Sequence, residues 1–145
     1  MKYTNLLLMT IGSFISMYIL MYSMVDSYAN VYSNLNQLYM AGIMTAPMVI
    51  LELFFMGSMY GNKKLNIGLT GLSVVSLCLL LTLLRKQVAI GDKEFLKSMI
   101  PHHAAALLMC KQNSLQDDEL KQLCKNISST QQAEIDFMKE KLAAL

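Results

Sequence analysis

Three long apolar runs limit what this chain can fold into. They cover about residues 6–24, 39–59 and 65–84, and Glu52 is the one acidic or basic side chain within them. A helix of about 20 apolar residues is long enough to cross the ~30 Å hydrocarbon layer of a bilayer. The sequence therefore predicts three transmembrane helices.

The charged residues divide the chain near residue 85. Charged side chains make up 15% of the sequence, against about 25% in soluble domains. Of the 12 Lys and Arg residues only three precede Arg85, and of the 10 Asp and Glu residues only two precede Asp92. We therefore predict a membrane module over residues 1–86 and a helical domain over residues 90–145. The net charge of +2, without a basic arm, argues against a nucleic-acid partner.

The basic residues also predict an orientation. Lys2 and the Lys63-Lys64 turn favour the cytoplasmic side, whereas residues 25–38 carry no Lys or Arg. Three crossings then place the C-terminal domain outside. Arg85 and Lys86 favour the opposite side. We predict a multi-pass protein of the bacterial inner (plasma) membrane with an extracytoplasmic C-terminal domain.

The C-terminal region predicts two antiparallel helices. Asp92 is a good N-cap for a helix that ends near Asn113, and Asp117 is one for a helix that extends nearly to Leu145. A short connection of this kind is typical of an antiparallel hairpin. The predicted fold class is therefore all-α, with three transmembrane helices followed by a two-helix hairpin. Such a small domain buries little core alone.

The only two histidines of the chain, His102 and His103, lie side by side after Pro101. Proline frees backbone carbonyls and bends a helix. At about 100° per residue, the soft donors near the histidines fall on one side of the helix. Thioether, thiol and imidazole together suit a soft metal ion, although a histidine on a helix face more often serves packing. These candidate ligands are Met99, His102, His103, Met109 and Cys110.

The second predicted helix supplies further candidates. Glu134 is polar on an otherwise apolar stripe, so it needs a partner. Together with Met138 it either completes the histidine site or orients an imidazole from behind. Cys110 and Cys124 flank the connection, which predicts either a disulfide or a pair of metal-binding thiolates.

Methionine is concentrated in the membrane module, where ten of the 13 methionines precede residue 60. Thioethers suit Cu(I) or Ag(I), but methionine is also a common apolar filler. Glu52 costs about 2.5 kcal/mol or more if charged in hydrocarbon, so it either hydrogen-bonds to a neighbouring Tyr or Ser or has a functional role. Secondary candidate ligands are Met17, Met21, Met24, Met40, Met44, Met48 and Glu52.

Several of these motifs together resemble a bacterial family known as domain of unknown function 305, over about residues 90–142. The motifs are Phe95-Leu96-Lys97-Ser98-Met99-Ile100-Pro101-His102-His103, Leu108-Met109-Cys110, Ile127, Gln131-Gln132, Glu134-Ile135 and Met138. In addition, Tyr39-Met40-Ala41-Gly42 and Thr45-Ala46-Pro47-Met48 are similar to the membrane leader of one branch of that family.

The resemblance implies a ferritin-like, extracytoplasmic helical bundle that binds copper through Met and His and supports copper tolerance. The positions that match are Met99, His102, His103, Met109 and Met138. This chain predicts one hairpin where family members often have two, so we expect a homodimer that completes a four-helix bundle, or docking onto the membrane helices. No Glu-x-x-His pair is present, so the resemblance does not extend to di-iron chemistry.

Our leading hypothesis is a non-enzymatic, membrane-anchored binder of Cu(I) or Ag(I) that serves sequestration, tolerance or hand-over. One alternative is an oligomeric metal-transport or channel component that uses Glu52 and the methionine ladder. Another is a structural membrane subunit without metal. The sequence contains no visible nucleophile with a base and no paired catalytic carboxylates, so we do not expect an enzyme.

Overall fold

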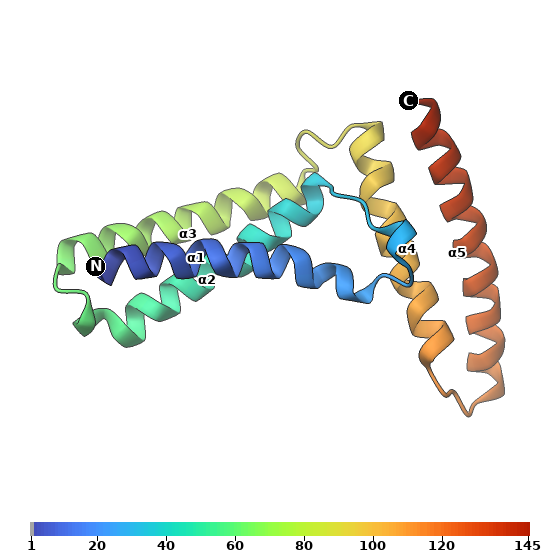
Figure 1. Cartoon of the computed structure of the whole chain (residues 1–145), viewed down its shortest axis with the longest axis horizontal. Helices are drawn as coiled ribbons and strands as arrows, with labels where there is room; N and C mark the ends of the chain where they lie inside the picture. Colours follow the sequence, from blue (N-terminus) through green and yellow to red (C-terminus); the bar gives the residue numbers. More distant parts are fainter. Residues whose placement is uncertain (1) are drawn as a thin grey trace. The chain divides into compact units, whose positions relative to one another are not determined.

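The computed structural model describes residues 2–145, and this part of the chain contains five α-helices and no β-strand (Figure 1). The predicted all-α class is therefore confirmed. The α-helices are α1 (Lys2–Leu20), α2 (Leu35–Met56), α3 (Lys63–Arg85), α4 (Asp92–Gln112) and α5 (Asp118–Ala144). Short 3-10 turns are η1 (Met21–Met24), η2 (Tyr28–Asn30) and η3 (Gly57–Met59). The chain forms two compact units, one of residues up to 21 with 36–89 and one of residues 22–35 with 90–145.

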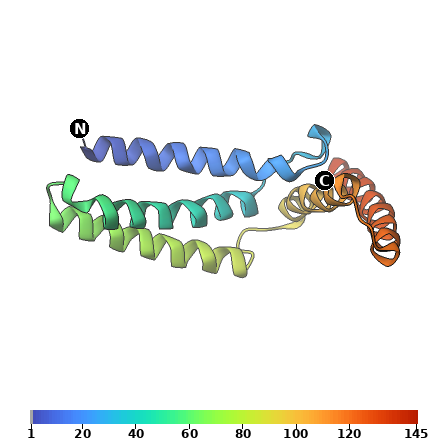
Figure 2. The ribbon, with the colours of Figure 1, turned by 90° about the horizontal axis from the view of Figure 1, so that it is seen from below.

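The first unit consists of α1, α2 and α3, which lie side by side (Figures 1 and 2). Three segments are long and apolar enough to cross a membrane: Lys2–Met24, Leu35–Met59 and Lys63–Arg85. Each extends a few residues beyond the predicted run. α3 has no buried residue although its mean hydropathy is 2.3. Its apolar side chains therefore need an apolar environment outside the chain.

Local signals determine where α3 begins and ends. The side chain of Asn62 accepts a hydrogen bond from the backbone N–H of Leu65 at 3.1 Å, which caps the first turn. At the other end, the N–H of Val88 donates to the carbonyl of Leu83 at 3.0 Å, as in a Schellman motif. Gln87 occupies the left-handed position of this motif with φ of 50°, where glycine is more common.

The second unit is built around α4 and α5, which lie side by side (Figure 1). We call these helices the α4–α5 pair. One face of each helix is apolar at a spacing of three or four residues, and the two faces meet in a common core. The buried residues of this core are Leu96, Ile100, Ala104 and Leu107 from α4 and Ile135 and Met138 from α5.

The N-cap of α5 is the residue predicted from the sequence, whereas the N-cap of α4 is a different residue. Asp117 caps α5 as predicted, because its side chain accepts from the backbone N–H of Leu120 at 2.9 Å. The N-cap of α4 is Gly91 and not Asp92, which is already the first helical residue. Asp92 therefore acts as a carboxylate in the first turn, where it interacts favourably with the helix dipole.

Residues 22–35 lie in the same compact unit as the α4–α5 pair. We call this segment the first loop. Val25 and Tyr32 pack against the core of the α4–α5 pair. The carboxylate of Asp26 lies 3.4 Å from the ammonium of Lys111. These contacts join residues that are far apart in the sequence, so periodicity alone does not indicate them.

Candidate metal site

The two histidines lie in the middle of α4, about one and a half turns after a carbonyl that Pro101 leaves without its usual partner. Proline has no N–H, so the carbonyl of Lys97 loses the helical hydrogen bond it would receive four residues later. The side-chain amide of Asn34 donates to this carbonyl at 3.4 Å. The first loop therefore satisfies the backbone group that the proline freed, and α4 continues through Pro101 without interruption.

His103 faces α5 and meets the carboxylate of Glu134. Its Nδ1 lies 3.0 Å from Oε2 of Glu134, and 13% of the His103 side chain is exposed against 48% of Glu134. The oxygen lies off the ring N–H direction, so this is a close polar contact and not an aligned hydrogen bond. The contact brings Glu134 together with one of the two histidines.

His102 is exposed, and its ring centroid lies 6.2 Å from that of His103. Adjacent residues of a helix point about 100° apart, so the two rings are neighbours on the surface of α4. The planes are inclined by 59°, so the rings are not stacked on each other.

Three methionines predicted as ligands occupy different environments. Met99 is half-buried against the core and precedes the histidines by one turn, or about 5 Å along the axis. Met138 is a buried core residue with 7% exposure. Met109 is exposed and lies two turns after His102, about 10 Å along the axis. Met99 is therefore the thioether closest to the pair along α4.

Cys110 and Cys124 form a disulfide in the structure, which is one of the two predicted alternatives. They contribute no thiolate while it is intact. Within residues 2–145, no group of three or more His, Cys, Asp or Glu side chains is arranged to hold a metal ion. The histidines are thus a pair of nitrogen donors, to which thioethers or a second copy can add.

Comparisons with known proteins agree with the sequence motifs. The family described as Domain of unknown function (DUF305) matches residues 80–142. Uncharacterized protein L153 of Acanthamoeba polyphaga mimivirus is 32% identical over 141 residues, which are 95% of this chain and 91% of that protein. This chain belongs to the DUF305 family. No solved structure matches it significantly.

The DUF305 match confirms the family that the motifs predicted. It includes all of α4 and most of α5, and it begins inside α3. The similarity to the mimivirus protein is longer, so it extends over the apolar helices as well as the DUF305 region.

The first loop contributes to the DUF305 region residues that sequence reasoning missed. Asn30 and Asn34 are buried polar residues, and Asn30 donates to Asp26 at 2.6 Å. The loop was visible as a stretch rich in Asn, Ser and Tyr. Its composition alone does not indicate the carbonyl of Lys97 as the acceptor for Asn34, because a proline in another segment creates that acceptor.

All but one of the secondary candidates lie in the first unit, and Met24 belongs to the second unit. Met40 and Met44 are 37% and 40% exposed, and Met24 is 48% exposed at the end of η1. Met17, Met21 and Met48 are half-buried. Glu52 accepts a hydrogen bond from the hydroxyl of Tyr60 at 2.8 Å.

Proposed function

We propose that this protein is a non-enzymatic, membrane-anchored binder of a soft monovalent ion, Cu(I) or Ag(I), which it sequesters or passes to a partner. One observation carries the proposal: an exposed imidazole lies 6.2 Å from a second imidazole whose Nδ1 faces a carboxylate. Two-coordinate binding by nitrogen, aided by thioether, suits Cu(I) better than a hard cation. The copper binding that the DUF305 resemblance implies agrees with this.

The proposal includes a membrane and a second copy of the chain. Three helices that are long and apolar enough to cross a membrane support insertion into a bilayer. We place the DUF305 region outside the cytoplasm, where a disulfide is stable. α5 exposes Leu120, Leu123 and Phe137, and a second α4–α5 pair that covers them would complete a four-helix bundle and add donors to the ion.

The test is an anaerobic titration of the detergent-purified full chain with Cu(I) against a chromogenic chelator. We expect the His102→Ala, His103→Ala double variant to bind at least about tenfold more weakly than the wild type. Gln112→Ala, an exposed change at the end of the same helix, is the matched control and keeps wild-type affinity. Equal affinity in the histidine variant contradicts the proposal.

A further inference from the structure

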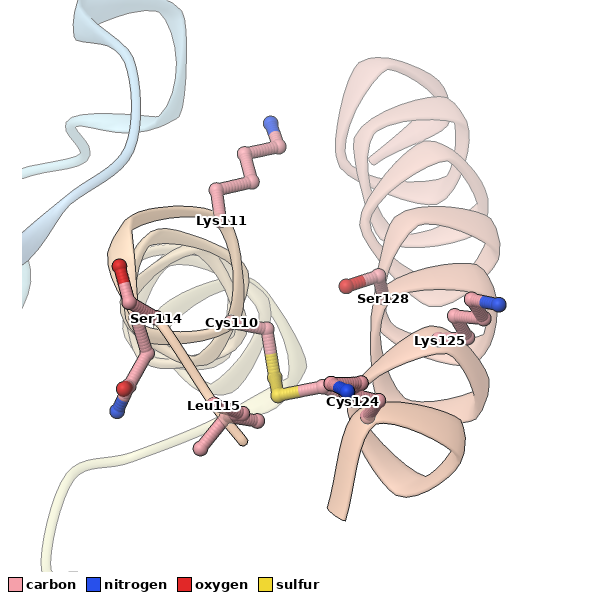
Figure 3. Close-up of a pocket in the computed structure, with 9 residues that line it drawn as sticks. Cys110, Lys111, Ser114, Leu115, Cys124, Lys125 and Ser128 are labelled. Atoms are coloured by element: carbon pink, nitrogen blue, oxygen red, sulfur yellow. A yellow bond between two sulfur atoms is a disulfide. The ribbon is translucent and has the colours of Figure 1, made fainter. Parts of the chain in front are cut away.

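A pocket at the connection between α4 and α5 plays no part in the proposed histidine site. It encloses about 530 Å³ and is lined by residues of both helices and of the connection between them. Figure 3 shows the Cys110–Cys124 disulfide crossing between the helices at this pocket, with Ser128 directed toward α4. Both cysteines are partly exposed. An attacking thiolate therefore has access to the sulfur atoms.

The disulfide, and not apolar packing, holds this end of the α4–α5 pair together. Leu107 is the last buried residue of α4, and Ile135 is the first buried residue of α5. α5 therefore has no buried side chain for about three turns after Cys124. A disulfide stabilises a fold mainly by restricting the unfolded chain that it closes into a loop. When it opens, the two sulfurs can move without disrupting the core.

Three lysines, Lys111, Lys121 and Lys125, line the pocket that the disulfide crosses. Asp118 pairs with Lys121 at 2.6 Å and Asp26 with Lys111 at 3.4 Å. Neighbouring lysines favour the thiolate over the thiol, and the thiolate is the form that binds a soft metal.

We propose that reduction of the Cys110–Cys124 disulfide creates a second soft-metal site, a two-thiolate site for Cu(I) or Ag(I), which the disulfide masks. Its physiological meaning rests on the proposed function, but its ligands are different. Cys110 lies eight residues after His102, about 12 Å along the helix. The two sites are therefore separate.

The chemistry needs a dithiol reductant of the thioredoxin class. Its thiolate attacks one sulfur and forms a mixed disulfide, and its second thiol then releases the protein. The reductant leaves as its own disulfide, so two electrons give two cysteine thiols. One Cu(I) then displaces two protons, and the resulting complex carries one negative charge beside the lysines.

The geometry of the pair allows this ligation. The Cα atoms of Cys110 and Cys124 are 5.4 Å apart. An ion held between two sulfurs at about 2.3 Å from each places them about 4.6 Å apart. Rotation about the two Cα–Cβ bonds reaches this separation while the backbone stays in place.

The experiment compares oxidised and reduced full chain in detergent. Cys78 is a free exposed cysteine in α3, so every protein carries Cys78→Ser. Dithiothreitol reduces the sample and is removed anaerobically, and alkylation followed by mass spectrometry verifies two new thiols. Titration with Ag(I), which undergoes no redox cycling, is expected to show one more bound ion per chain after reduction. The Cys110→Ser, Cys124→Ser variant is expected to bind the same number before and after.

Three outcomes overturn the inference: a disulfide that the dithiol does not open in the folded chain, an unchanged number of ions after reduction, or a gain that persists in the serine variant. If the serine variant does not fold, N-ethylmaleimide on the reduced protein replaces it, and this alkylation must abolish the gain. The His102→Ala, His103→Ala variant separates the two proposals. If the oxidised histidine variant binds as many ions as the oxidised wild type, the proposed function fails. The inference is tested separately, because it requires one more bound ion after reduction whether or not the histidines are present.

Discussion

The contact between His103 and Glu134 shows that the His103 side chain lies against α5. Adjacent residues on a helix point about 100° apart, so His102 faces outward when His103 faces α5. A carboxylate that accepts a hydrogen bond from the other ring nitrogen of a metal-binding histidine restricts the ring and makes it a stronger donor, and we infer this role for Glu134 once an ion is bound. The sequence could predict the candidate pair and name Glu134 as a partner, because a polar residue on an apolar stripe needs one. The distance from Glu134 to the His103 ring, and the exposure of Glu134, depend on how α4 and α5 pack.

Removal of this carboxylate tests its orienting role. We expect Glu134→Ala to weaken Cu(I) binding about tenfold, because metal-binding histidines lose affinity by about 10–100-fold without such a partner. Glu140→Ala changes an exposed carboxylate on the same helix and serves as the control in the same chelator competition. If both variants bind like the wild type, Glu134 does not orient a ligand.

Glu94 links the first loop to α4 in a way that depends on pH. The ammonium of Lys97, at 2.9 Å, lowers the pKa of Glu94, and the backbone N–H of Leu35 at 3.0 Å lowers it further, whereas burial opposes both. A carboxyl with a lowered folded-state pKa stabilises the fold above its unfolded pKa of about 4.3. This stabilisation is lost as the pH falls through the folded pKa.

We therefore expect Glu94→Gln to destabilise the loop by about 1 kcal/mol at neutral pH. Hydrogen exchange of peptides from residues 22–35 measures this, with wild type and variant compared at each pH. The difference should shrink as the pH falls from about 4.3 through the lowered folded-state pKa, where the wild-type carboxyl becomes protonated. Asp136→Gln, an exposed change on α5, is the control. A difference that does not change with pH contradicts the role of the charge.

At the scale of elements, the sequence predicts those features that depend on neighbouring residues, such as the position and start of a helix. Apolar runs indicate the helices of the first unit, and the cap at Asp117 marks the start of α5. The first loop is different, because its contacts join residues 59 to 85 positions apart, such as Leu35 with Glu94 and Asp26 with Lys111. Neither partner carries a local pattern that identifies the other. Chain order alone therefore groups the loop with the membrane module, whereas its contacts lie within the second unit.

The end of α2 gives Glu52 a structural partner. Glu52 lies one turn before the end of α2 and accepts from Tyr60, which is 7% exposed. The ring of Tyr3 lies 5.4 Å from that of Tyr60, and the hydroxyl of Tyr3 donates to Asn66 at 2.8 Å. This polar cluster joins α1, α2 and α3, which favours the hydrogen-bonded interpretation of Glu52 over a role in transport.

Two substitutions distinguish these interpretations. Tyr60→Phe removes the donor, so we expect about 1 kcal/mol of lost stability and a lower melting temperature in detergent. Glu52→Gln keeps an oxygen that accepts from Tyr60, so it should melt close to the wild type. Metal uptake into vesicles should be the same for wild type and Glu52→Gln. Reduced uptake in a Glu52→Gln protein of normal stability would favour the transport alternative.

At the scale of the whole molecule, the second unit restricts the membrane topology because it contains two separate segments of the chain. Residues 22–35 and 90–145 pack into one unit, so both must lie on the same side of a membrane. Three crossings satisfy this condition, because the segments after the first and the third crossing emerge on the same side. The packing therefore requires an even number of crossings between these segments, and the two apolar helices α2 and α3 supply two. This condition is independent of the lysines that predicted the orientation.

Labelling of single cysteines in a Cys78→Ser background tests this topology in intact cells. A membrane-impermeant maleimide should modify Tyr28→Cys, at a position that is 92% exposed in the first loop, and Ser114→Cys, in the connection between α4 and α5. Ser58→Cys, in the turn between α2 and α3, should react only after permeabilisation. The reverse pattern keeps three crossings but turns the protein over, as Arg85 and Lys86 would favour. Tyr28 and Ser114 on opposite sides contradict the three-crossing topology, because the packing of the second unit could not then form.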